Sequence, residues 1–262
     1  MQANRVNFQR IWILGYSGTA SQIAETLPFQ RKGSRYKLRQ LRPDYLQRMQ
    51  AVLQAAQNNG QQVMLTLFDH WSLATPGIFP QTPWYFKNNT DRLLKQPFPD
   101  FFDLKNRKLM EIQKNYVQKI VSGAQRYSPI YEIMNEAAGS DCGVLSAWHQ
   151  RVTQWIHGVD ADARIAVNLM ADCPEILHAP WVNVVSFHGN DWSKKGICPL
   201  AKSYSDKIVV IDTDGAWKTR NDNVLVSDWL DQARSCGASF NHKDDIYMPD
   251  LEVLQLIRES PR

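Results

Sequence analysis

Apolar runs alternate with amphipathic stretches along almost the whole chain. Seven runs are rich in β-branched residues and have the length of buried strands; they cover residues 6–14, 63–68, 130–134, 164–169, 182–187, 208–211 and 238–240. The stretch after Pro43 has apolar residues at helical spacing and ends at Gly60, where a helix C-cap belongs. The same spacing predicts helices over residues 109–120, 144–155, 222–234 and 251–257.

This alternation predicts an α/β fold with a parallel sheet. No glycine-rich dinucleotide turn follows the first run, so a (β/α)8-type TIM barrel is favoured over an open sheet. A full barrel needs eight strands, and we therefore expect an incomplete or seven-stranded one. No repeat or linker interrupts residues 1–262, which predicts one domain. The connection 72–104 is unusually long, with five Pro and seven aromatic residues, and is expected to serve function.

Composition narrows the function classes. The net charge of +4 is spread along the chain without basic runs, so nucleic acid is not an expected partner. No apolar stretch approaches about 18 residues, and no membrane span is expected. Residues 1–10 lack the apolar core of a secretory signal, which leaves a cytoplasmic chain and a secreted one without its signal both open. The four Cys form no Cys-x-x-Cys pair, so no zinc site is expected and the redox compartment stays open, as does the oligomeric state.

Polar residues follow the apolar runs directly, where a barrel places its active site. In chain order these residues are Asp69, His70, Asn135, Glu136, Asn168, His188, Asp212, Asp214, Asn241 and His242. Carboxylates from different strands thus reach one edge of the predicted sheet. Glycoside hydrolysis requires two such carboxyl groups, one protonated and one ionised.

Asn135 and Glu136 follow the run 130–134 and resemble the Asn-Glu motif that ends the fourth strand in clan A glycoside hydrolases, the cellulase-like (β/α)8 enzymes. The resemblance implies that Glu136 is the general acid/base and that Asn135 holds the sugar 2-hydroxyl. It also implies an oligo- or polysaccharide substrate, with no metal or organic cofactor.

Three more positions match this clan in the right order. Arg10, in Asn-Phe-Gln-Arg-Ile-Trp, is similar to the Arg that ends the second strand near the nucleophile. His70 is similar to the His after the third strand, and His188 to the His after the sixth. The resemblance runs from Val6 to Phe240 and implies that these three side chains contact the substrate or the second carboxylate.

The chain departs from the clan at strand seven. The clan has a nucleophilic Glu there, whereas this chain reads Asp212-Thr213-Asp214-Gly215. Asp212 is the better positional match and Asp214 stays an alternative. Because Asp is one methylene shorter, its distance from Glu136 can exceed the roughly 5 to 5.5 Å that retention requires, which leaves inversion or lost activity open. In addition, no strand matches the clan's first, and Asn241 and His242 stand where an aromatic residue usually follows strand eight.

Each candidate also has a structural interpretation. Glu136 can stabilise a helix N-terminus, Arg10 can be a buried ion-pair partner, and the histidines can be structural. Asp212 or Asp214 can make an Asx-turn before Gly215. Four tryptophans in or near loops can stack on a sugar ring or pack within the loops; they are Trp71, Trp84, Trp192 and Trp217. Asn88-Asn89-Thr90 fits a glycosylation sequon.

Three functional hypotheses follow. The preferred one is a glycosidase in which Glu136 and Asp212 act as the carboxyl pair, while Trp71, Trp217 and the connection 72–104 contact the glycan. The second is a carbohydrate-binding pseudoenzyme that kept the cleft and lost the chemistry. The third is a metal-dependent hydrolase, whose candidate ligands are Asp69, His70, His188 and Asp212.

Overall fold

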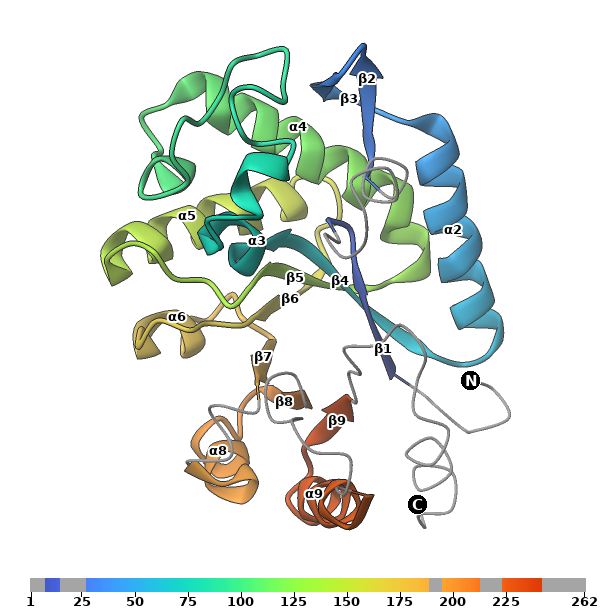
Figure 1. Cartoon of the computed structure of the whole chain (residues 1–262). Helices are drawn as coiled ribbons and strands as arrows, with labels where there is room; N and C mark the ends of the chain where they lie inside the picture. Colours follow the sequence, from blue (N-terminus) through green and yellow to red (C-terminus); the bar gives the residue numbers. More distant parts are fainter. Residues whose placement is uncertain (1–7, 15–26, 189–194, 213–222, 242–262) are drawn as a thin grey trace.

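The computed structural model describes residues 8–14, 27–188, 195–212 and 223–241. Its main feature is a curled sheet of seven parallel strands in the order β1-β4-β5-β6-β7-β8-β9, flanked by helices (Figure 1). The strands are β1 (Phe8–Trp12), β4 (Gln62–Asp69), β5 (Ile130–Asn135), β6 (Arg164–Val167), β7 (Val184–Phe187), β8 (Ile208–Asp212) and β9 (Ser239–Asn241). Each corresponds to a predicted strand. The described sheet has seven strands, and its end strands β1 and β9 come within 8 Å of each other without pairing, which confirms the incomplete-barrel prediction.

The helices lie outside this sheet. They are α2 (Pro43–Asn58), α3 (His70–Ala74), α4 (Arg107–Ala124), α5 (Cys142–His157), α6 (Pro174–Leu177), α8 (Ile197–Ser203) and α9 (Asn223–Ser235). Local chemistry fixes several ends: the Asn106 side chain accepts from the Leu109 amide at the start of α4, and Gly60 takes a φ of 67° just after α2. The predicted helix 251–257 lies outside the described residues.

Two apolar layers pack on the sheet. The outer layer, under α4 and α5, holds an aromatic cluster of buried rings; its members are Phe68, Trp84, Phe101, Tyr116 and Trp148. The inner layer lies inside the barrel and is made by Met64, Ile130, Ala166, Val184 and Val210, with Phe8 against them. This division follows from the twofold alternation of side chains along a strand.

The same alternation places a polar layer above the inner apolar one. Two residues further along each strand, toward its carboxyl end, stand Arg10, Thr66, Glu132, Asn168, Ser186 and Asp212. Successive residues of a strand point to opposite faces, so a residue and the one two positions later share a face. The barrel interior is therefore apolar at its base and charged at its carboxyl end.

Two features were not predicted. An antiparallel hairpin of β2 (Phe29–Lys32) and β3 (Arg35–Leu41) stands between β1 and α2. Two disulfides, Cys142–Cys173 and Cys198–Cys236, link α5 to the start of α6 and α8 to the segment after α9. Among the described residues, no helix combines the length and the apolar character that crossing a bilayer requires.

The long connection after β4 is folded locally and packed. It contains α3 and two 3-10 turns, η2 (Phe79–Gln81) and η3 (Asp100–Phe102). Trp84 is only 1% exposed, so it packs in the core and is unavailable for sugar stacking. The side-chain amide nitrogen of Asn88 is the atom at which a glycan would be attached in the sequon. This nitrogen donates hydrogen bonds to the carbonyls of Pro80 and Thr82.

Candidate active site

Arg10 is the centre of the polar layer. Its Nη2 lies 2.5 Å from Glu132 Oε2 and its Nη1 lies 3.1 Å from Asp212 Oδ2. The side chains of Arg10, Glu132 and Asp212 are 2%, 0% and 0% exposed. One guanidinium thus joins carboxylates from β5 and β8, and this confirms the interpretation of Arg10 as a buried ion-pair partner.

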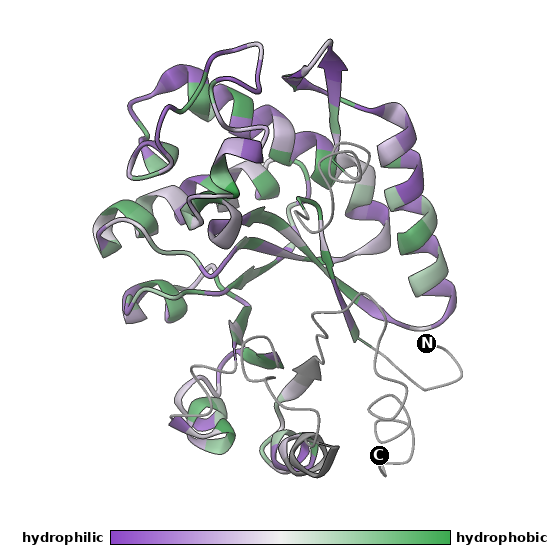
Figure 2. Ribbon diagram, in the orientation of Figure 1, coloured by the Kyte–Doolittle hydropathy of each residue, from purple (hydrophilic) through white to green (hydrophobic). Residues whose placement is uncertain are grey.

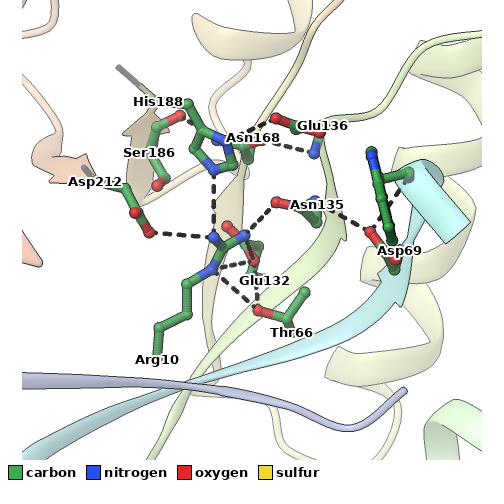
Figure 3. Close-up of polar contacts among 11 residues, drawn as sticks. Arg10, Thr66, Asp69, Glu132, Asn135, Glu136, Asn168, Ser186, His188 and Asp212 are labelled. Carbon is green, nitrogen blue, oxygen red and sulfur yellow. Dashed lines mark hydrogen bonds and ion pairs between the residues drawn. The ribbon is translucent and has the colours of Figure 1, made fainter. Parts of the chain in front are cut away.

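Arg10 makes further contacts to Asn135 at the end of β5, to Thr66 of β4 and to His188 just after β7 (Figure 3). Nη2 donates to Asn135 Oδ1 over 2.7 Å, and Nη1 lies 3.2 Å from His188 Nε2. Nε donates to Thr66 Oγ1 over 3.2 Å. Since five guanidinium N–H groups sit in a fixed plane, these contacts hold side chains from β4, β5, β7 and β8 in one arrangement.

His188 connects Arg10 to Glu136. His188 Nδ1 lies 2.9 Å from Glu136 Oε1, and an arginine can only donate, so Nε2 accepts from Arg10 and Nδ1–H donates to Glu136. Burial lowers the pKa of His188, but the hydrogen bond to Glu136 and the Asp212 carboxylate outweigh burial and raise this pKa above its ordinary value. The network therefore runs from Glu136 through His188 and Arg10 to Asp212.

Glu136 directly follows β5 and has a backbone conformation that residues other than glycine rarely adopt. Its φ is 51°, and its amide donates to Asn168 Oδ1 over 2.6 Å. Asn168 in turn donates to the Ser186 carbonyl over 2.8 Å. A left-handed residue costs of order 1 to 3 kcal/mol and persists where its surroundings hold it, a condition that clusters at functional sites. The Glu136 carboxylate stays 17% exposed, in contrast to the fully buried Asp212.

Asp69, at the end of β4, supports this centre. The Asp69 carboxylate accepts from the amides of Trp71 and Ser72 and from Asn135 Nδ2 over 3.0 Å. Burial raises the pKa of Asp69, and the hydrogen bonds from Asn135 and Ser72 oppose it. Asp69 thus caps α3 and orients the Asn135 amide, whose oxygen faces Arg10.

The His70 ring stacks on Phe98 at a centroid distance of 4.8 Å. Burial lowers the pKa of His70, and the negative charge of Glu136 opposes this shift. Phe98 belongs to the long connection, so this connection reaches the candidate site through His70. Trp71, the next residue, is 50% exposed, so part of its side chain is open to solvent.

Two of the predicted site residues, Asp214 and Trp217, lie outside the described residues, as do Trp192 and His242. Sequence reasoning missed Glu132 and Thr66, which hold Arg10. The signal was present: Glu132 is a lone carboxylate inside the apolar run 130–134, and Arg10 is a lone cation inside the run 6–14. When two predicted buried strands each contain one charged residue, and the two charges are opposite, the residues are expected to form a buried ion pair.

The metal-ligand hypothesis required Asp69, His70, His188 and Asp212 to converge. Within the described ranges, the one group of three potential ligands with closely spaced atoms is Cys142, Cys173 and Glu175. Its two thiols are joined in a disulfide and cannot ligate as thiolates. The described residues therefore do not assemble the proposed metal site.

The fold is shared with solved glycoside hydrolases. The chain superposes on an endo-1,4-β-mannanase from Rhizomucor miehei with a TM-score of 0.68 at 14% identity, covering 98% of this chain and 86% of that one. An endo-β-1,4-mannanase from Thermotoga petrophila gives 0.67 at 15% identity, covering 98% and 70%. Endo-glycoceramidase II from a Rhodococcus species gives 0.60 at 15% identity, covering 97% and 78%.

Comparison by sequence gives no such likeness. No family model matches the chain, and no curated protein does. The structural likenesses confirm the prediction of a cellulase-like (β/α)8 glycosidase fold in incomplete form. The chain thus has the fold of these glycoside hydrolase barrels, and the Arg10-centred network lies at the carboxyl end of its sheet.

Proposed function

We propose that this chain hydrolyses O-glycosidic bonds of an oligo- or polysaccharide with two carboxyl groups. The observation that carries the proposal is the continuous network from Glu136 through His188 and Arg10 to Asp212 at the carboxyl ends of the strands. In barrels of this class, chemistry is built at that end. The enzymes with the same fold whose names state a substrate act on mannans and glycosylceramides.

Glu136 is the proton donor in this proposal. His188 occupies Oε1 with its N–H, so Oε2 is the atom that presents a proton to the departing glycosidic oxygen. Its partial exposure makes it the carboxyl that a substrate reaches first. Asn135 and Trp71 bind sugar hydroxyls and a ring face, respectively.

Asp212 is the second carboxylate. Its contact with the Arg10 guanidinium stabilises the ionised form, which a nucleophile or a general base needs. At roughly 5 to 5.5 Å from Glu136 it acts as nucleophile with retention, and at a larger separation it activates water with inversion. Asp214 is the alternative for this role.

A second candidate function is glycan binding without turnover. The specific observation in its favour is that Asp212 is fully buried and held by Arg10, an arrangement that also suits a structural carboxylate. Hydrolysis distinguishes the two functions, because a binding protein releases no sugar.

The leaving group provides the sharpest test. Native chain and Glu136→Gln are compared on a β-mannan and on aryl glycosides with good and poor leaving groups. We expect Glu136→Gln to lose about 10²- to 10⁴-fold on the polysaccharide, and much less where the phenol departs without protonation. Equal losses on all substrates would remove Glu136 from the proton-donor role. Asp212→Asn and Asp214→Asn then assign the second carboxylate, because its loss slows both aryl classes.

A further inference from the structure

The β2–β3 hairpin carries a concentration of positive charge. It belongs to the connection that leaves the carboxyl end of β1 and enters α2, so it stands on the same side of the barrel as the candidate site (Figure 1). Figure 2 shows the end of the hairpin near its turn in the purple of hydrophilic residues. The expectation of a charge spread without basic runs is wrong here, because residues 26–43 contain no acidic residue and six basic ones, namely Arg31, Lys32, Arg35, Lys37, Arg39 and Arg42.

Strand alternation places four of these cations on one outer face, namely Lys32, Arg35, Lys37 and Arg39. Tyr36 and Leu38 are buried against the core, which turns Arg35, Lys37 and Arg39 away from it. Lys32 pairs directly with Arg35 across the hairpin, and cross-strand partners share a face. Side chains two positions apart on a strand are spaced roughly 7 Å, so the outer face is a row of closely spaced cations.

Carboxylates neutralise only two of the six. Arg39 lies 3.4 Å from Asp91 and 3.6 Å from Glu111, and Arg42 contacts Asp44. Over the described ranges, the other four form no ion pair within 4.0 Å; these are Arg31, Lys32, Arg35 and Lys37. Like charges directly opposite one another destabilise a sheet. Repulsion among these cations therefore destabilises the hairpin, and a bound anionic ligand reduces this repulsion.

The surroundings favour one kind of polyanion. Both aromatic residues of the hairpin, Phe29 and Tyr36, are buried, so no ring is free to stack on a nucleic-acid base. None of the large exposed apolar side chains of the described residues lies on the hairpin, so it has no group to insert into a lipid surface. The two disulfides are typical of oxidising compartments, where extracellular polysaccharides are available.

The hairpin is also connected to the candidate site. The backbone of Tyr36 exchanges hydrogen bonds with Asn88 and Thr90 of the long connection. The same connection carries Phe98 against His70. The hairpin is therefore joined through one packed segment to the residues around Glu136.

We propose that the outer face of the β2–β3 hairpin, with Lys32, Arg35 and Lys37 at its centre, binds a polysaccharide that carries carboxylate or sulfate groups. The consequence that the hydrolysed substrate is anionic rests on the proposed function, whereas the binding does not. Ionic contacts along a polyanion release condensed counterions, so the affinity falls steeply with salt.

Equilibrium binding tests the surface. Fluorescently labelled polygalacturonate, dextran sulfate, neutral mannan and a 20-base-pair DNA duplex are titrated with the Glu136→Gln chain at 50 and 200 mM NaCl. The test variant adds Lys32→Gln, Arg35→Gln and Lys37→Gln. The control adds Arg126→Gln, Arg151→Gln and Lys202→Gln, which remove the same charge from exposed positions elsewhere.

We expect the hairpin variant to weaken binding of an anionic polysaccharide by tenfold or more and to lower the salt slope by about 2 to 3, with a much smaller effect of the control. The two anionic polymers tell carboxylate from sulfate recognition. Equal losses in both variants, absence of binding to both anionic polymers, or DNA bound as tightly with the same hairpin dependence would each overturn the proposal. Hydrolysis of an uncharged aryl glycoside keeps the two proposals separate. For this assay the hairpin substitutions are placed in the chain that retains Glu136. If only the binding surface is lost, this variant still hydrolyses the aryl glycoside at the native rate.

Discussion

Replacing Arg10 with Met tests whether the buried guanidinium holds the candidate site together. The substitution keeps most of the apolar volume and removes the charge. It leaves Glu132 and Asp212, both fully buried, without their cation. Breaking a buried ion pair by removing one partner costs roughly 3 to 5 kcal/mol. Because Arg10 pairs with two carboxylates, we expect the free energy of unfolding to fall by an amount at the upper end of this range. That is a large share of the roughly 5 to 15 kcal/mol by which a typical domain is stable.

A double-mutant cycle isolates the interaction. Urea unfolding at pH 7, followed by tryptophan fluorescence and circular dichroism, gives the free energy of unfolding for Arg10→Met, Glu132→Gln and the double variant. We expect the double variant to be more stable than the sum of the single losses predicts, by about 2 to 3 kcal/mol. Arg48→Met is the matched control, because Arg48 is 58% exposed in its pair with Asp44 and its unfolding midpoint should stay near the native one. Strict additivity, or an Arg10→Met loss below about 1 kcal/mol, would refute the reasoning.

Three further predictions concern stability and binding. Full burial lowers the pKa of His149 from 6.5 to about 4, so the unfolded chain binds more protons between these values. The free energy of unfolding should therefore fall by roughly 3 kcal/mol as the pH drops through this window, and His149→Gln should flatten that pH dependence in urea titrations. Cys142→Ser and Cys173→Ser remove a disulfide that joins residues 31 positions apart. The free energy of unfolding should fall by about 3 to 4 kcal/mol, measured by thermal and urea unfolding against the oxidised native chain. Trp71→Ala should weaken glycan binding up to about tenfold by calorimetry while unfolding stays near native; unchanged affinity would exclude Trp71 from the binding surface.

The pattern of apolar runs was sufficient to predict the seven strands of the barrel, because burial on both faces leaves near-continuous apolar segments. The hairpin escaped prediction, since Phe29, Tyr36, Leu38 and Leu41 are too few among its basic residues to give a strong alternating signal. Tertiary contacts decide such a segment: its apolar side chains are buried in the core, where Phe29 packs against Trp84 of the long connection and Tyr116 of α4.

The candidate site was predicted in part. Strand-end position and resemblance identified Arg10, Asn135, Glu136, His188 and Asp212, and the structure brings them together. Sequence could not tell a ligand-facing tryptophan from a packed one. Trp71 and Trp84 both follow β4, yet only Trp71 is exposed, because Trp84 fits among Phe29, Phe68 and Tyr116.

Sugar release from a β-mannan and a panel of other polysaccharides, by the native chain and by Glu136→Gln side by side, is the most direct test of the central claim. The account predicts that the native chain releases sugar from at least one polysaccharide and that Glu136→Gln, folded to the same circular dichroism spectrum, loses most of that rate. Native turnover that survives the substitution, or glycan binding with no sugar released by the native chain, would contradict it.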